Sequence, residues 1–182
     1  MAKKSVAVHT NATKVLYQAN VPYAIHQYEQ SEAATQEQQG LHPDAFDHPE
    51  RVFRTIVTVV DDEPLAALVP VDCVLDGPLV AAAVGGESAT IADSELAAET
   101  TGFPANAVSP LGTKSDLPVL IDVCALDFKT IYVSAGEEGF TIELAPAALL
   151  TLTNARTAPI ARRLQLYLRR VTNPSTPWIG SH

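Results

Sequence analysis

The chain has 182 residues, of which 47% are hydrophobic and 18% are charged, so it is long and apolar enough for one domain with its own core. This composition excludes an intrinsically disordered protein, and no apolar run is long enough to span a bilayer. The formal net charge of −9 argues against unspecific binding to nucleic acid, which depends on a broad basic surface. We therefore expect neither DNA nor a membrane among the partners of the chain.

The first residues and the two cysteines bear on the compartment. Residues 1–5 contain two lysines, but the polar residues 9–11 interrupt the apolar stretch that a signal peptide needs. Cys73 and Cys124 lack the spacing of metal ligands, so we expect buried thiols in a reducing compartment. These features predict a cytoplasmic protein.

Apolar spacing, capping residues and turn residues predict the elements of the first half of the chain. We expect helices over residues 10–19, 76–84 and 94–99, and strands over residues 21–29, 52–60, 65–71 and 88–91. The second and third of these strands are expected to form a hairpin across a turn at 61–64. The polar stretch 30–50 has room for a short helix that ends at Gly40.

The second half alternates short strands and helices. We expect strands over 119–122, 130–133 and 140–144, a helical turn over 125–128, and helices over 146–152 and about 159–170. Strands and helices mixed with hairpins indicate an α+β fold, a mixed β-sheet surrounded by helices. The sequence predicts one domain over residues 1–171 and an extended tail over residues 172–182.

Two of the predicted strands carry polar residues in an alternating pattern. On strand 21–29, His26 and Tyr28 share one face, where they form either a pocket wall or a half-exposed edge. On strand 52–60, Arg54 heads an otherwise apolar face. A buried cation needs a partner or a ligand, and the alternative is a strand-end arginine whose head reaches water.

Other polar groups follow weaker patterns. His42 and His48 flank Asp44 and Asp47, which are possible metal ligands, but the spacing matches no strong motif and we interpret them as loop residues, with no metal site. Five arginines of the C-terminal segment form either a local basic face or the solvated side of the last helix. They are Arg156, Arg162, Arg163, Arg169 and Arg170.

The stretch Ser109-Pro110-Leu111-Gly112 stands shortly before the predicted strand 119–122. Proline fixes one backbone angle and glycine permits a positive one, so these residues predict a rigid loop. Rigid loops at strand ends often carry small-molecule sites, although an ordinary tight turn fits the same residues.

Taken in order, eight short motifs resemble the YbaK/EbsC family of aminoacyl-tRNA deacylases, relatives of the editing domain inserted in bacterial prolyl-tRNA synthetases. The resemblance runs from residue 10 to residue 163, and the order of the motifs carries it. The motifs are Ile25-His26-Gln27-Tyr28-Glu29, Val52-Phe53-Arg54-Thr55, Thr101-Gly102-Phe103, Ser109-Pro110-Leu111-Gly112, Ile121-Asp122, Ile131-Tyr132-Val133-Ser134-Ala135-Gly136, Ile142-Glu143-Leu144-Ala145 and Ile160-Ala161-Arg162-Arg163.

The resemblance implies a small mixed sheet wrapped by helices, with a pocket for the 3′-terminal aminoacyl-adenosine of tRNA. Typical members clear Cys-tRNA(Pro), because cysteine resembles proline in size and one small group gives only about 1–3 kcal/mol of discrimination. The implied chemistry is substrate-assisted: the cysteinyl thiol attacks its own ester, while the protein supplies positioning and oxyanion donors. The implied partner is aminoacyl-tRNA, prolyl-tRNA synthetase is left open as a second one, and no cofactor is implied.

Residue by residue, the resemblance assigns roles to ten positions. Arg54 falls where the family usually has an essential lysine, and it is the implied catalytic residue. The implied substrate-binding residues are Tyr28, His26, Asn106, Ser109, Pro110, Gly112, Ser134, Gly136 and Thr141.

The chain departs from the family's pattern inside this implied pocket. Arg54 replaces the lysine and cannot act as a base. Asn106 replaces the first glycine of a Gly-x-x-x-Pro loop, and asparagine tolerates a left-handed backbone better than most residues. Thr141 stands where an aspartate is common, and Ala135 stands where a glycine is common.

Two functional classes therefore remain open. The first is a free-standing trans-editing deacylase that clears mischarged tRNA, Cys-tRNA(Pro) above all. The second is a non-catalytic or repurposed binder of aminoacyl-tRNA or of a nucleotide-like ligand. A metalloenzyme built on His42 and His48 ranks third.

Overall fold

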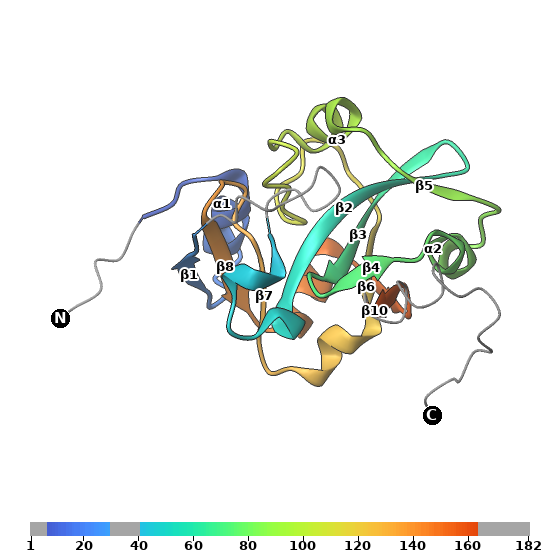
Figure 1. Cartoon of the computed structure of the whole chain (residues 1–182). Helices are drawn as coiled ribbons and strands as arrows, with labels where there is room; N and C mark the ends of the chain where they lie inside the picture. Colours follow the sequence, from blue (N-terminus) through green and yellow to red (C-terminus); the bar gives the residue numbers. More distant parts are fainter. Residues whose placement is uncertain (1–6, 30–40, 164–182) are drawn as a thin grey trace.

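The computed structural model describes residues 7–29 and 41–163, and an eight-stranded mixed sheet is its main element (Figure 1). The strands pair in the order β1-β8-β7-β2-β3-β6-β9, and β5 pairs with the second half of β2. Their bounds are β1 Ala24–Gln27, β2 Val52–Val60, β3 Glu63–Pro70, β5 Ala89–Ile91, β6 Val119–Asp122, β7 Ile131–Ser134, β8 Phe140–Leu144 and β9 Arg156–Ala158. A two-stranded sheet pairs β4 Cys73–Leu75 with β10 Ala161–Arg163. The α+β fold expected from the sequence is confirmed.

The helices of the described residues are short, and three of the four α-helices follow a residue whose side chain caps them. The α-helices are α1 Asn11–Gln18, α2 Gly77–Val84, α3 Ser94–Thr101 and α4 Pro146–Thr153, and the 3₁₀ turns are η2 Pro43–Ala45, η3 Pro49–Arg51 and η4 Val123–Asp127. The side chains of Thr10, Asp76 and Asp93 accept amide hydrogen bonds from the first turns of α1, α2 and α3. Within residues 7–29 and 41–163, no helix is long and apolar enough to cross a membrane.

The sheet separates two apolar layers. On its first face, Phe53 packs in a core that includes Leu16 of α1 and Leu149 of α4. On its second face, Val69 packs in a smaller core that includes Val80 of α2. Because successive strand residues alternate between the faces, the polar residues interleaved with the first core all emerge on the second face.

Most of the predicted elements are confirmed, and the bounds predicted for β2, β6 and β8 match those observed. β1 is shorter than predicted, since only residues 24–27 pair with β8. The hairpin turn is also shorter than predicted: Asp61 and Asp62 have φ values of 46° and 71°, the left-handed conformation that a two-residue turn between twisted strands requires. The short helix predicted to end at Gly40 lies outside the described residues.

The helix predicted from residue 159 is wrong over its first turn, because residues 161–163 form strand β10 beside β4. The reason is a long-range contact. The buried carboxylate of Asp122 accepts hydrogen bonds from the amides of Ile160 at 2.9 Å and Ala161 at 2.8 Å, which holds this segment extended at the end of β6. Arg162 pairs with Asp76 instead of lining a solvated helix face. Residues 164–170 and the predicted tail lie outside the described residues.

Replacing Asp122 tests this clamp. Its carboxylate also accepts the Cys124 amide at 3.0 Å, so Asp122→Ala leaves three amides without their acceptor. We expect the free energy of unfolding in urea to fall by about 3 kcal/mol. Asp127→Ala, an exposed aspartate of η4, is the control and should change it by less than about 0.5 kcal/mol. An unchanged unfolding midpoint for Asp122→Ala would show that the clamp does not hold β10.

Candidate functional site

Four polar side chains from four neighbouring strands lie in one line across the second face of the sheet. His26 on β1 is in register with Thr141 on β8, and Thr141 is in register with Ser134 on β7. β7 and β2 run parallel, and one step beyond their last paired residues the register places Ser134 beside Arg54. We call these four residues the polar row. With strands about 4.8 Å apart, the row is roughly 14 Å long.

Arg54 supplies a permanent positive charge at one end of the polar row. It is only 8% exposed, and its Nη2 atom donates a hydrogen bond to the carbonyl oxygen of Cys73 at 2.9 Å. The alternative in which its head reaches water is therefore wrong. A guanidinium buried to this extent stays only where hydrogen bonds hold it, so its position beside Ser134 is well defined.

The turn that follows Ser134 is held tightly on both sides. The buried Ser134 Oγ accepts a hydrogen bond from the Gly136 amide at 3.1 Å. Gly136 has a φ of 86°, and a Cβ atom there would lie 2.5 Å from the Phe103 ring, so only glycine fits. Thr10 Oγ1 donates to the carbonyl oxygen of Ala135 at 2.5 Å. Residues 134–136 therefore present a rigid backbone at the end of β7.

Thr141 is the least satisfied member of the polar row. It is 1% exposed, and its Oγ1 atom has no hydrogen-bond partner in the part of the chain that the structure describes. A buried hydroxyl without a partner costs about 1–3 kcal/mol. It lies between His26 and Ser134, where a bound molecule that reaches the row would find an available donor and acceptor.

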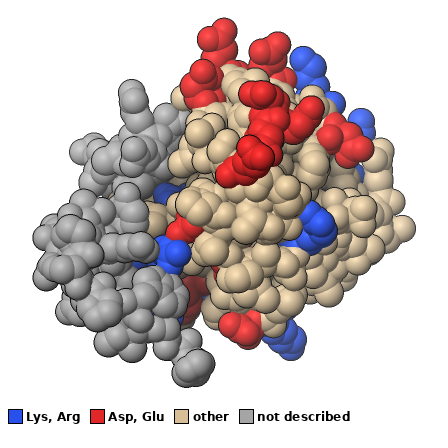
Figure 2. Space-filling model, turned by 90° about the vertical axis from the view of Figure 1, so that its right-hand side faces the viewer, with Lys and Arg blue, Asp and Glu red and all other residues tan. Residues whose placement is uncertain are grey.

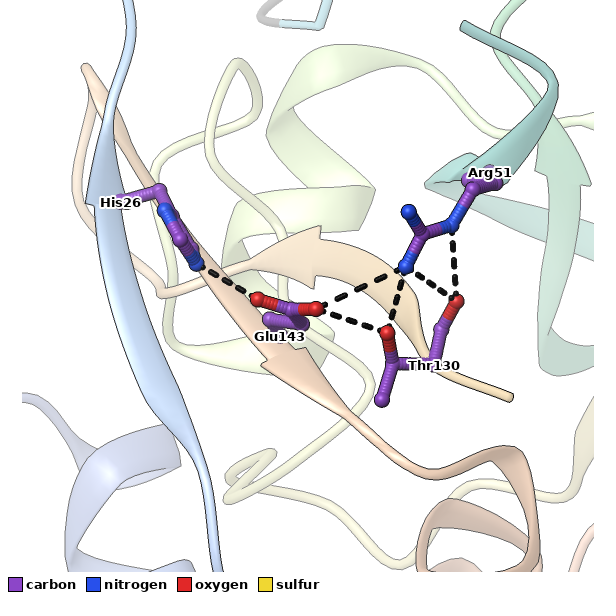
Figure 3. Close-up of polar contacts among 4 residues, drawn as sticks. All are labelled: His26, Arg51, Thr130 and Glu143. Atoms are coloured by element: carbon purple, nitrogen blue, oxygen red, sulfur yellow. Dashed lines mark hydrogen bonds and ion pairs between the residues drawn. The ribbon is translucent and has the colours of Figure 1, made fainter. Parts of the chain in front are cut away.

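A charged network lies beside the row and fixes His26 (Figure 3). Glu143 follows Thr141 by two residues and so shares its face, and its Oε2 atom lies 2.7 Å from His26 Nε2. Thr130 Oγ1 donates to Glu143 Oε1 at 2.7 Å, and Arg51 Nη2 lies 3.5 Å from the same oxygen. These contacts, the Thr130 hydrogen bond foremost, lower the pKa of Glu143, so the carboxylate stays ionised.

Two tyrosines complete this part of the face. The Tyr132 ring lies 5.2 Å from Arg51 Cζ, and the His26 ring meets it edge-on at a centroid distance of 5.2 Å. Tyr28 packs against Phe46, also at 5.2 Å between ring centroids. Burial raises the pKa of both tyrosines, so both phenols remain neutral donors.

Comparison with known proteins identifies the family. A profile described as "Aminoacyl-tRNA editing domain" matches residues 30–152. A protein of Enterococcus faecalis (strain ATCC 700802 / V583), whose name assigns it as a Cys-tRNA(Pro)/Cys-tRNA(Cys) deacylase, EbsC, is 33% identical over 169 residues, which cover 90% of this chain and 99% of that protein. The chain belongs to the aminoacyl-tRNA editing domain family.

Solved structures support the same fold for this editing domain. A structure whose title assigns it as a trans-editing enzyme for prolyl-tRNA synthetase matches with a TM-score of 0.69 and 21% identity, over 86% of this chain and 99% of that one. The hypothetical protein APE2540 matches with a TM-score of 0.71 and 17% identity, over 84% of this chain and all of that one.

The structure brings most of the predicted site residues of the editing domain together. Arg54, Ser134, Thr141 and His26 form the polar row, Gly136 follows it, and Tyr28 stands at the end of β1. The Asn106 amide contacts the carboxylate of Glu138 in the turn after β7. Asn106 is not among the residues with positive φ, so this loop does not need the left-handed backbone that asparagine tolerates.

The rest of the predicted loop has visible packing roles. Ser109 and Pro110 are buried, and Ser109 Oγ accepts the amide of Leu111 at 3.3 Å. Gly112 has a φ of 73°, and a Cβ atom there would lie 2.5 Å from the carbonyl oxygen of Asn11 in α1. These contacts explain a rigid turn, and substrate binding by Ser109, Pro110 and Gly112 stays a prediction.

The remaining candidate groups lie apart from one another. His42 contacts Asp44 at 3.5 Å, and His48 contacts Glu50 at 3.3 Å. Across residues 7–29 and 41–163, no three His, Cys, Asp or Glu side chains come together as metal ligands. The thiols are half-buried rather than fully buried, and burial raises the pKa of Cys73 to about 12 and also raises that of Cys124, so both stay protonated.

Sequence reasoning missed the role of Arg51, Thr130 and Tyr132. Tyr132 alternates with Ser134, so the period of the strand already places it on the face of the polar row. No local pattern points to Arg51, which precedes β2 and bonds Thr130 from 79 positions away in the sequence.

Replacing Glu143 by glutamine tests the network through its acid dependence. The pKa of Glu143 is lowered from its ordinary value of 4.5, so the folded chain binds this proton less readily than the unfolded chain. The carboxylate therefore stabilises the fold above that ordinary value, and this contribution is lost as the pH falls through the lowered pKa. We expect urea unfolding to show the parent more stable than Glu143→Gln at about pH 7, with a difference that shrinks between about pH 5 and 3.

Glu137→Gln is the matched control. Glu137 is exposed, so this change should alter the free energy of unfolding little at any pH. A parent-to-Glu143→Gln difference that stays constant down to about pH 3 would contradict the network.

Proposed function

We propose that this editing domain is a free-standing deacylase that clears mischarged tRNA, with Cys-tRNA(Pro) as its leading substrate. The observation that carries the proposal is the polar row, in which a buried guanidinium, an unpartnered hydroxyl and a rigid glycine turn converge at the end of β7. The relationship to the Enterococcus deacylase supports the same substrate class. The partner is then aminoacyl-tRNA, engaged through its 3′-terminal aminoacyl-adenosine. Any association with prolyl-tRNA synthetase and a cytoplasmic location follow as parts of the same proposal.

The geometry of the row supports chemistry without a protein nucleophile. Ser134 and His26 are separated by β8, which puts them about 10 Å apart, beyond the hydrogen-bond reach that an activated serine needs. The Cys73 thiol is held protonated by its raised pKa. A cysteinyl ester brings its own thiol, which suits a site that supplies position and charge rather than a nucleophile.

In this mechanism the substrate thiol attacks its own ester carbonyl. A carbon–sulfur bond forms, the bond to the ribose 3′ oxygen breaks, and that oxygen takes up the proton that the thiol loses. Negative charge develops on the carbonyl oxygen, and Arg54 is the cation placed to stabilise it. Because Arg54 is already buried and bonded, little reorganisation accompanies the reaction. An arginine stays charged throughout, so its role is electrostatic and not that of a base.

One observation favours the second candidate, a binder of aminoacyl-tRNA without catalysis. The middle of the row is Thr141, a neutral hydroxyl, and the nearby carboxylate of Glu143 is engaged by His26, Thr130 and Arg51. A site without an available carboxylate holds the α-ammonium group of an aminoacyl ester less firmly, which weakens positioning more than it weakens contact with the nucleotide.

A deacylation time course with Cys-tRNA(Pro), Ala-tRNA(Pro) and Pro-tRNA(Pro) distinguishes the candidates. We expect the parent to release cysteine and to leave proline attached, Arg54→Lys to retain activity, and Arg54→Gln and Arg54→Ala to lose about 100-fold or more in rate. Because Arg54 is buried, unfolding curves accompany each variant. Arg156→Ala is the matched control, since Arg156 also donates to a backbone carbonyl, that of Ala83, but is itself exposed.

Activity of Arg54→Gln equal to that of the parent would remove Arg54 from the chemistry. Absence of turnover of all three substrates by a parent that binds tRNA would replace the deacylase with the binder.

The unpartnered hydroxyl of Thr141 makes a second prediction, in which stability and activity change in opposite directions. Thr141→Val keeps the shape and removes the hydroxyl, so we expect the free energy of unfolding to rise by about 1 kcal/mol. If the hydroxyl binds the aminoacyl group, kcat/KM falls by about 5- to 30-fold. Thr55→Val is the matched control, because Thr55 Oγ1 is also buried without a partner in the described residues but lies on the opposite face of the sheet. Equal kcat/KM for Thr141→Val and the parent would contradict a substrate contact.

A further inference from the structure

A hollow of about 1200 Å³ lies between α1 and the edge strand β1, and His26 is the one residue of the polar row that lines it. Its lining comes from residues 7–11, 13, 14, 17 and 23–27, with Phe140 of β8. None of these lining residues is acidic, although the whole chain carries a net charge of −9. The carboxylate of Glu143 lies beside the lining because it pairs with His26, but the lining residues themselves carry no negative charge, which suits a partner that is itself negatively charged.

Aromatic rings line this hollow. Tyr17 of α1 is 79% exposed, and Tyr23 and Phe140 also line the cavity. A tyrosine this exposed gains free energy when a flat ligand covers its ring. Stacking on aromatic rings is how proteins hold the bases of single-stranded nucleic acid, because every base offers a flat face.

Basic and polar groups accompany the rings. Lys14 precedes Tyr17 by three residues, so both lie on the same side of α1, and His9 stands just before the helix. A lysine beside an exposed tyrosine offers one contact to a phosphate and one to a base, and the hydroxyl and amide groups of the lining add neutral donors and acceptors.

The hollow and the polar row share His26. This histidine lines the hollow and is also the first residue of the row, whose other end, Arg54, lies about 14 Å away across three strand spacings. A strand of nucleic acid in the hollow would thus have its terminal nucleotide beside β1, and its 3′ ester would pass the edge of the sheet to the second face, where the polar row lies.

The distribution of acidic residues elsewhere on the described surface also favours RNA binding in the hollow. Figure 2 shows Asp and Glu side chains gathered at the upper end of the molecule, the end where Figure 1 places α3 and the tip of the β2–β3 hairpin. The exposed acidic residues of these elements are Asp61, Asp62, Glu63, Asp93, Glu95 and Glu99. This end repels phosphates, so an RNA that reaches the row is favoured to approach from the side of α1 and β1.

We infer that the hollow between α1 and β1 binds the single-stranded 3′ end of tRNA, with unpaired bases stacked on Tyr17 and Tyr23 and a phosphate near Lys14. The inference rests on the proposed function for the identity of the RNA. It assigns a surface that the chemistry at Arg54 does not require. A second copy of the chain pairing along β1, the last strand of the sheet among the described residues, is the competing occupant. The described lining around Lys14 and His9 contains no acidic residue, which favours RNA over a self-complementary contact.

Fluorescence anisotropy with a labelled RNA strand that ends in CCA and carries no amino acid tests the surface. We expect the parent to bind this strand more tightly than a blunt duplex, and Tyr17→Ser to weaken binding by about 5- to 100-fold. Lys14→Glu should weaken binding and reduce the slope of log K against log salt concentration by about 0.7 per lost phosphate contact. Lys129→Glu and Leu126→Ser are the matched controls, because both positions are exposed and neither lines the hollow, and they should bind as the parent does.

Three results would overturn the inference, of which the first two concern binding and assembly. One is unchanged RNA affinity in both Tyr17→Ser and Lys14→Glu; the other is a parent dimer in analytical ultracentrifugation that Tyr17→Ser converts to monomer. Because this RNA carries no amino acid, the binding experiment does not depend on turnover. The third result is deacylation of Cys-tRNA(Pro) by Tyr17→Ser and Lys14→Glu at the rate and KM of the parent, which would exclude RNA binding in the hollow and leave the deacylase intact. Specific RNA binding by a parent that turns over no substrate would instead exclude the deacylase and leave RNA binding in the hollow intact.

Discussion

The pairing register of β1, β8, β7 and β2 is the constraint on which the candidate site depends. Side chains alternate between the faces of a sheet, so a slip of one residue in any of these pairs would send its member of the polar row into the apolar core. Phe53, Val133 and Ile142 occupy that core at positions next to Arg54, Ser134 and Thr141. The same apolar burial that stabilises the sheet therefore aligns the four polar groups, and it does so with residues that are far apart in the sequence.

The site combines groups that are costly to bury with contacts that hold them. Arg54 is bonded to the Cys73 carbonyl, Ser134 to the Gly136 amide, and His26 to the ionised Glu143, whereas Thr141 has no partner in the described residues. A rigid row with one unsatisfied hydroxyl is what a preorganised binding site looks like before its ligand arrives, because stability is given up where a substrate contact is gained.

Sequence patterns predicted much of this arrangement, and the failures have physical causes. Period-two alternation put His26 on one face with Tyr28 and put Arg54 on the otherwise apolar face of its strand. Caps and turn residues located most elements, and the ordered motifs pointed to the family. The helix predicted from residue 159 failed because the carboxylate of Asp122, 38 positions earlier, takes the Ile160 amide and favours an extended chain. Arg51 and Thr130 were missed for the same reason, since a contact between distant segments leaves no local pattern. Gly112 was read as part of a pocket, while its visible contact is a close approach to α1.

The central claim is that the polar row receives the aminoacyl group. The most direct measurement is amide and side-chain NMR of the chain titrated with 3′-cysteinylamido-adenosine, in which an amide replaces the ester and prevents turnover. The account predicts shift changes centred on Arg54, Ser134, Gly136 and Thr141, abolished in Arg54→Gln and unchanged in Arg156→Ala. A second hollow is lined by Thr55, Ala97 and Val108 and also touches Arg54. Shift changes at Thr55, Ala97 and Val108 that leave Ser134, Gly136 and Thr141 unchanged would contradict the account.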